Sequence, residues 1–204
     1  FGDSPQFYDA IQTADKQIGK VWQVIKEREA KFNEDWLIII TTDHGRDAET
    51  GRNHGGQSDR ERSTWIVTNA RQLNDGFRQR PGVVDIYPTI CRHLQIAIPE
   101  AVSREVDGTP FIGPIDLANL RAEKVEGTIA LRWKNMNKNS SIKAEIFVTS
   151  TNRFKEGGED EYLKAGEVSV SDEKLEIKPD SLSNFYKIVV KTPNQYANVW
   201  VTKK

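Results

Sequence analysis

The chain has 204 residues, with 29 Lys and Arg against 30 Asp and Glu, and a formal net charge of −1. This balance gives no electrostatic signature of a nucleic-acid partner or an anionic membrane surface. Cys91 is the single cysteine, which excludes an intrachain disulfide framework and a cysteine-based zinc finger. The longest apolar run, residues 36–40, is far shorter than the roughly 20 residues that a transmembrane helix needs.

The first predicted element is one long helix over residues 4–32. Ser4 is a favourable N-cap, and Pro5 suits the first helical position, where its missing N–H costs nothing. Asn33 is a suitable stop. Apolar residues recur at spacings of three and four, which predicts one apolar face: Phe7, Ile11, Ala14, Ile18, Val21, Trp22 and Ile25.

The region after this helix predicts an α/β arrangement. Residues 35–42 form a β-branched run without alternation, which is typical of a strand buried on both faces. A second strand is predicted over residues 64–68, and the polar stretch between them is predicted to be irregular. A helix then follows from about Asp85 to Leu94, with Pro88 in its first turn. A helix followed by a buried strand is the pattern of an α/β sheet.

From about residue 116 the pattern changes to short alternating segments separated by turn residues, which predicts an all-β sandwich. Gly113 and Pro114 mark the expected linker. We therefore predict an α/β portion over residues 1–115 and a β-sandwich over residues 116–204. The segments expected to be strands are residues 128–133, 142–149, 167–170, 174–177, 185–191 and 199–202.

The candidate chemistry is concentrated in the polar stretch that follows the first predicted strand. That strand ends in Asp43 and His44, and His54 follows ten residues later, so two of the three histidines belong to one loop. Ligands bind at the C-terminal ends of strands in open α/β sheets. Imidazole and carboxylate are natural ligands for zinc, and also suit manganese or iron. Gly45 permits the break that would let Asp43 and His44 face one ion or two neighbouring ions, and Gly55-Gly56 would let the backbone pass close to a metal or bound anion.

Other polar residues of the region have ordinary structural interpretations. Four arginines could clamp a phosphate, but interleaved acidic residues also suit a solvated loop. Ser63 and Thr64 lack the features of a nucleophile. We expect structural roles for three further residues: Asp85 as a helix cap, Cys91 as a small core residue and His93 as a surface histidine at a helix end. The arginines are Arg46, Arg52, Arg60 and Arg62.

Three segments together resemble the closing part of an alkaline phosphatase superfamily catalytic domain. They are LIIITTDHGRDAETGRNHGG, STWIVTNA and GVVDIYPTICRHLQI followed by VDGTPF. The similarity covers about residues 1–113 and is greatest to the type I phosphodiesterase/nucleotide pyrophosphatase branch. The helix SPQFYDAIQTADKQIGKVWQVI also resembles the segment that precedes the Asp-His strand in these enzymes.

This resemblance implies a site of two divalent metal ions, usually zinc, that clamps a phosphoryl group and works through a covalent phospho-enzyme. It assigns Asp43 and His44 to the ion next to the nucleophile, and His54 to the second ion. The family's nucleophile and remaining ligands come from a preceding segment that this sequence does not contain. We therefore expect the C-terminal part of a phosphodiesterase or pyrophosphatase, with an incomplete metal site, no catalytic residue of its own and no turnover by itself.

The second half resembles a fibronectin type III-like sandwich, through GTIALRWKN, IKAEIFVTSTNRF and LEIKPDSLSNFYKIVVKT. Trp133 matches the buried tryptophan of an early strand, and Tyr186 matches a tyrosine corner. Four aromatic residues could instead form a sugar-binding platform, although packing is the favoured interpretation. They are Phe154, Tyr162, Tyr196 and Trp200.

Two alternatives stay open. Within the same class, the parent enzyme could be a sulfatase or a metal-dependent mutase. From a different class, the chain could be a non-catalytic interaction module, in which a degenerate α/β scaffold presents the sandwich to a glycan or a protein. The expected ligand of the parent enzyme is a phosphate-ester small molecule or head group. By analogy with enzymes that carry an added sandwich, we expect a periplasmic, cell-surface or secreted location.

Overall fold

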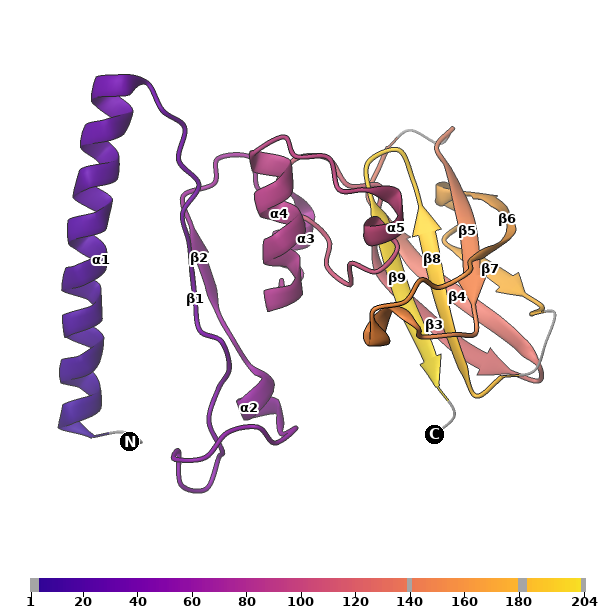
Figure 1. The fold of residues 1–204 in the computed structure, drawn as a ribbon, viewed down its shortest axis with the longest axis horizontal. Coiled ribbons are helices and arrows are strands. Elements are labelled where there is room, and N and C mark those ends of the chain that lie inside the picture. The colour runs from indigo at the N-terminus through magenta and orange to yellow at the C-terminus, as the bar shows by residue number, and fades with distance from the viewer. Residues whose placement is uncertain (1–3, 139–140, 180–182, 203–204) are drawn as a thin grey trace. The chain divides into compact units, whose positions relative to one another are not determined.

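The computed structural model describes residues 4–138, 141–179 and 183–202 (Figure 1). It contains helices and several antiparallel sheets, and its contacts divide the chain into two compact units, Phe1–Ala70 and Arg71–Lys204. Over the residues described, none of the helices combines the length and the apolar character needed to cross a membrane.

The first unit begins with α1 (Pro5–Phe32), which confirms the predicted helix and both of its ends. The Ser4 side chain accepts a hydrogen bond from the Phe7 N–H at 3.3 Å, and Pro5 occupies the first turn. At the other end Asn33 adopts a left-handed conformation with φ 54°, and its N–H donates to the Glu29 carbonyl. These local signals are sufficient to start and stop a helix.

The apolar face of α1 is largely uncovered within its own unit. Ile25 is the one buried hydrophobic residue that residues 4–70 contribute. Most of the other predicted face residues are exposed: Phe7, Ile11, Ile18, Val21 and Trp22.

The two predicted strands of the first unit pair as an antiparallel ribbon of β1 (Ile39–Thr41) and β2 (Ile66–Thr68), with Ile40 opposite Val67. Burial of β1 on both faces was wrong, because its residues are half-buried. The physical reason is that no further described layer of residues 4–70 covers the ribbon, and Val67 is exposed. A short helix, α2 (Asp59–Arg62), lies in the stretch predicted to be irregular.

The second unit begins with three helices, α3 (Asp75–Arg78), α4 (Ile86–His93) and α5 (Glu100–Ser103). As predicted, the chain enters α4 near Asp85 and places Pro88 in the first turn. The Asp85 carboxylate accepts hydrogen bonds from the N–H groups of Gly82 at 2.7 Å and Thr109 at 2.6 Å. It therefore ties the start of the helix to a segment 24 residues later.

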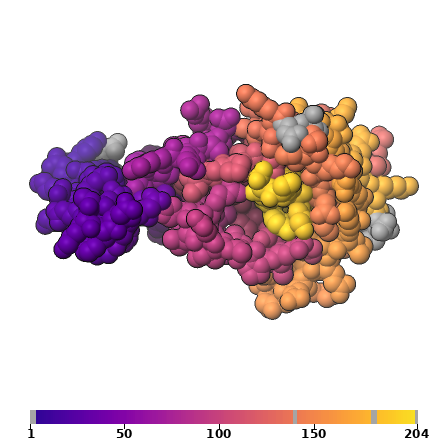
Figure 2. Space-filling model, turned by 90° about the horizontal axis from the view of Figure 1, so that it is seen from above, coloured from indigo at the N-terminus to yellow at the C-terminus, as the bar shows by residue number. Residues whose placement is uncertain are grey.

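The rest of the second unit consists of two antiparallel sheets, and Figure 2 shows this unit, coloured magenta to yellow, as one continuous body. The first sheet has the order β3-β4-β7 and the second the order β6-β5-β8-β9. All six predicted strand segments fall on strands, and β3 was not predicted. The bounds are β3 (Leu117–Val125), β4 (Thr128–Asn135), β5 (Lys143–Thr149), β6 (Leu163–Ser169), β7 (Lys174–Ile177), β8 (Phe185–Lys191) and β9 (Tyr196–Thr202).

Both sheets contribute side chains to one core. Trp133 on β4 is buried, and its indole N–H donates to the Val170 carbonyl at 2.8 Å. Tyr186 at the start of β8 is buried, and its hydroxyl accepts a hydrogen bond from the Ser183 N–H at 2.7 Å. This bond back to the preceding backbone is the geometry of a tyrosine corner. Other core residues are Leu117, Ile129, Leu131, Ala144, Ile146, Ile188, Val190 and Val201.

The outer face of the second sheet is covered by the segment around α5. Lys187 on β8 forms a buried ion pair with Glu105, whose carboxylate also accepts a hydrogen bond from the Tyr162 hydroxyl at 2.6 Å. Asn198 on β9 donates to the Val106 carbonyl at 2.9 Å. These contacts explain why the division between the units lies at residues 70 and 71, whereas the sequence analysis places the domain boundary at residues 115 and 116.

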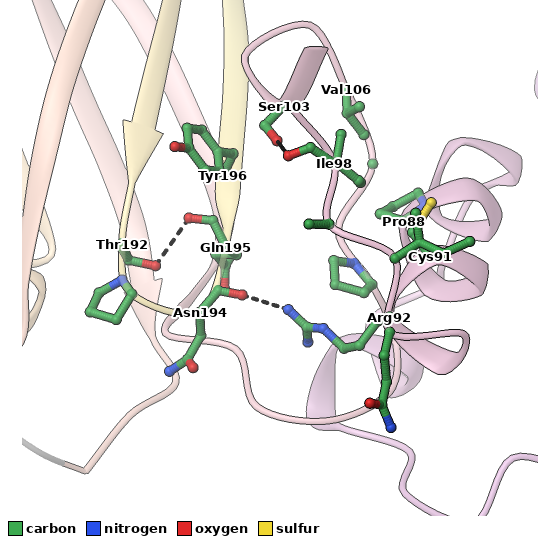
Figure 3. Close-up of a pocket in the computed structure, with 16 residues that line it drawn as sticks. Pro88, Cys91, Arg92, Ile98, Ser103, Val106, Thr192, Asn194, Gln195 and Tyr196 are labelled. Atoms are coloured by element: carbon green, nitrogen blue, oxygen red, sulfur yellow. Dashed lines mark hydrogen bonds between the residues drawn. The ribbon is translucent and has the colours of Figure 1, made fainter. Parts of the chain in front are cut away.

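The predicted linker at Gly113 and Pro114 is a hydrogen-bonded junction. The Arg92 guanidinium donates to the carbonyls of Ile112 and Pro114, at 2.8 and 2.7 Å, and to that of Asn194 in the β8–β9 turn (Figure 3). A cavity of about 490 Å³ opens between this turn and the segment after α4. Arg92 bridges the two walls of this cavity, so the junction fixes residues 71–115 against the sheets.

Candidate metal-binding loop

The predicted ligands Asp43 and His44 follow directly after β1. The His44 Nδ1 atom lies 2.8 Å from the Gly45 carbonyl oxygen. Because a carbonyl oxygen can only accept, Nδ1 carries the proton, and the lone pair of a neutral imidazole is then at Nε2. This Nε2 atom lies 3.3 Å from the Asp43 Oδ2 atom. The backbone N–H of His44 donates to the other Asp43 oxygen at 2.9 Å, which fixes the carboxylate beside the ring.

The third predicted ligand, His54, lies against His44. The two imidazole rings are stacked, with centroids 4.3 Å apart and an interplanar angle of 21°. The loop thus brings together all three residues that the sequence analysis selected. The site is open, since Asp43 is 85% exposed and His44 34% exposed.

The loop does not gather a complete set of ligands around one ion in the part of the chain that the structure describes. Within the described ranges, no three or more His, Cys, Asp or Glu residues surround one point as ligands of one ion. Asp43 and His44 form one pair of donors, and the His54 ring is stacked on that of His44. Carboxylate and imidazole fit zinc in chemical type.

Two glycines allow the loop to cross close to α2. A Cβ on Gly45 would lie 1.9 Å from the Arg60 carbonyl oxygen, and one on Gly56 would lie 2.5 Å from the Glu61 carboxylate. The expectation that Gly55-Gly56 lets the backbone pass close to a metal or a bound anion stays a prediction, and Gly56 itself lies close to an acidic side chain. Its close neighbour is Glu61, which accepts a hydrogen bond from the Gly56 N–H at 2.9 Å.

Sequence reasoning missed the residue that organises this loop, Asp47. Its carboxylate accepts hydrogen bonds from the backbone N–H groups of Glu49, Thr50, Arg52 and Asn53, at 2.6–3.1 Å. Hydrogen bonds to the carboxylate hold the pKa of Asp47 well below its usual range, and the N–H groups of Thr50 and Asn53 contribute most to this lowering. A signal for α2 was present in the sequence, because Ser58 and Glu61 have the spacing of a capping box and form one.

The remaining candidates have structural contacts. The Arg46 guanidinium donates to the Arg52 carbonyl at 3.1 Å. The Ser63 hydroxyl donates to the Asp59 carbonyl at 2.6 Å, at the end of α2. Cys91 is buried and His93 ends α4, as the sequence analysis expected. Arg52, Arg60 and Arg62 are exposed.

Comparisons with known proteins leave the family of the chain unassigned. No protein-family model and no curated protein matches it. Two solved structures of pectate lyase Pel3 from Pectobacterium carotovorum are 15% identical to the chain, with TM-scores of 0.30 and 0.32. The similarity covers 44% of this chain and 27% of that protein, so the chain spans about a quarter of its length. TM-scores this low assign neither fold nor function.

Proposed function

We propose that the chain is the C-terminal part of a two-metal phosphodiesterase- or pyrophosphatase-type hydrolase and carries part of its metal site. The observation that carries this proposal is the meeting of Asp43, His44 and His54 in one exposed loop after β1. We selected these residues from their types and spacing and from the family resemblance, and His44 contacts both of the others.

The orientation of His44 supports a cation at this position. Its Nδ1 proton is used by the Gly45 carbonyl, so the other ring nitrogen, Nε2, is left beside the Asp43 carboxylate. A positive charge beside these two atoms, which lie 3.3 Å apart, would stabilise their contact, and either a proton or a metal ion could supply it. A carbonyl that fixes the tautomer of a histidine is also a recurrent support of metal ligands.

Each residue has a separate part in the proposed chemistry. Asp43 and His44 would hold one ion, and His54 would hold the second. When bound, such ions supply Lewis acidity to a phosphoryl oxygen and neutralise developing charge. The chain's own residues hold the donors in place, and the exposure of the loop leaves room for a phosphate ester. No nucleophile is assigned within this chain, so we expect no turnover by the chain alone.

We also propose that residues 116–204 form a fibronectin type III-like β-sandwich appended to an alkaline phosphatase-like α/β portion. The support is the pair of antiparallel sheets with a common core, the buried Trp133 and the Tyr186 hydroxyl bonded to the backbone of Ser183. The contacts of Tyr162 argue against the aromatic platform, because this residue is half-buried and hydrogen-bonded to Glu105, whereas Phe154 and Trp200 are exposed.

The test is a zinc titration of the full chain by calorimetry, with His44→Ala and His54→Ala and with His93→Ala as the matched control. His93 is the third histidine and lies at the end of α4, outside the loop. We expect saturable binding that weakens by more than about tenfold in both loop variants, because even supporting groups of metal sites are worth that much. The His93 variant should bind as the unchanged chain does. Equal affinity in all four proteins would contradict the proposal.

A further inference from the structure

We propose that two acidic residues, Asp47 and Glu61, are positioning residues that hold His44 and His54 in their stacked arrangement. This inference rests on the proposed function, because it explains how the proposed metal ligands are kept together. Neither residue is a ligand in our assignment. Each acts through backbone groups that flank the two histidines.

Asp47 fixes the backbone immediately before His54. Its N–H donates to the Asn53 carbonyl at 2.9 Å, and its Oδ2 atom accepts from the Asn53 N–H at 2.7 Å. Asn53 is therefore held at both of its backbone groups by a residue that lies three positions after His44. The same carboxylate accepts hydrogen bonds from the N–H and the hydroxyl of Thr50, so it stabilises the whole chain segment between the two histidines.

Glu61 connects the two arms of the loop from the side of α2. Its backbone carbonyl accepts from the Gly45 N–H at 2.8 Å, one residue after His44. Its carboxylate accepts from the Gly56 N–H at 2.9 Å, two residues after His54. The Ser58 hydroxyl donates to the other oxygen at 2.5 Å and fixes the side chain. One residue therefore sets the distance between the two chain segments that carry the histidines.

The role of Asp47 needs a carboxylate. An ionised carboxylate offers about four acceptor positions, whereas an amide replaces half of them with donors. Each of the backbone groups bonded to the Asp47 side chain is a donor, so an Asn side chain would place its NH₂ against N–H groups. The pKa of Glu61 is lowered, first by its hydrogen bond with Ser58 and then by that with Gly56, as expected for an acceptor held in its charged form.

The experiment compares the full chain with Asp47→Asn and Glu61→Ala, and uses Glu49→Ala as the control for loss of one acidic side chain from the same loop. Two readouts are taken. Without metal, nuclear Overhauser contacts between the His44 and His54 rings report stacking. With zinc, calorimetry reports affinity. We expect the ring contacts to be lost and zinc binding to weaken by about 10- to 100-fold in both test variants, with little change in the control.

The outcomes separate this inference from the proposed function. Ring contacts that persist in both test variants, or that are absent from the unchanged chain, overturn the positioning roles. Loss of the Ile40–Val67 pairing of β1 and β2 in the test variants also overturns them, because the acids would then support the whole unit. If the unchanged chain shows the ring contacts but binds no zinc, the proposed function fails, while loss of those contacts in the variants still supports positioning.

Discussion

The two units of the chain are stabilised in different ways. In the second unit Ile146 and Ile188 are completely buried between the sheets, whereas in the first unit Ile11 is 49% exposed on α1. Burial of a large aliphatic side chain contributes about 1.5–3 kcal/mol, so the second unit gains its stability from its own core. The first unit gains little in this way and depends on caps, turns and polar hydrogen bonds. The candidate site therefore lies where local bonding determines the geometry.

This difference changes how substitutions should act. In the second unit a substitution lowers stability when it removes packing contacts or a buried partner. In the first unit an apolar substitution removes few contacts, and a substitution of Asp47 or Glu61 removes several hydrogen bonds to backbone. The free energy of opening of the β8 amides, measured by hydrogen exchange, reports on the second unit alone.

The largest expected effect is at the buried ion pair between Glu105 and Lys187. Their side chains are 5% and 2% exposed, and Glu105→Ala would leave the Lys187 charge buried without its partner. Breaking such a pair costs about 3–5 kcal/mol, a large part of the roughly 5–15 kcal/mol that stabilises an ordinary domain. Exchange of the β8 amides should accelerate accordingly.

Glu100→Ala is the matched control for this experiment. Glu100 forms ion pairs with Arg104 at 2.8 Å and Lys191 at 3.2 Å, but its side chain is half-exposed. Exposed pairs contribute about 0–1 kcal/mol, so the control should change β8 exchange little. If the two variants lost equal stability, the covering of the sheet by the α5 segment would not contribute as described.

A second prediction compares the two apolar environments directly. Ile188→Ala removes a completely buried side chain of β8 and should cost about 2–5 kcal/mol. Ile11→Ala removes the same atoms from an exposed position of α1 and should change stability by no more than about 0.5 kcal/mol. Hydrogen exchange of β8 and of α1 in each variant provides the measurement. A cost above 1 kcal/mol for Ile11→Ala would show that α1 is covered in solution.

Local signals in the sequence predicted local structure well. Both ends of α1 were predictable because Ser4 and Asn33 form their capping contacts with neighbouring residues. The alternating strands were predictable because each of them places one side in a core. The division between the units could not be predicted in this way. It depends on contacts such as Arg92 with Asn194, which are 102 residues apart and follow no sequence period.

The candidate site shows the same limit at a smaller scale. Residue type and spacing were sufficient to select Asp43, His44 and His54, because metal ligands belong to a short list of chemical groups. Asp47 and Glu61 were interpreted only as counter-charges or as part of a solvated loop. Their role depends on which backbone N–H groups point toward them, and this is decided by dihedral angles that composition does not specify.

The smallest expected effect is a pH dependence confined to the loop of the first unit. The folded pKa of Asp47 lies below its unfolded value, mainly because of the hydrogen bond from the Thr50 N–H and then that from Asn53. A carboxylate of this kind contributes stability that is fully present above the unfolded pKa, about 3.9, and is lost as the pH falls through the folded pKa. The Asn53 amide should therefore remain protected from exchange at pH 4 and lose protection only in stronger acid.

Asp47→Asn should remove this dependence and leave Asn53 unprotected at every pH, while β8 protection is unchanged. Loss of Asn53 protection near pH 5 in the unchanged chain would contradict the hydrogen-bonded geometry of the loop, and with it the basis for holding the two histidines together.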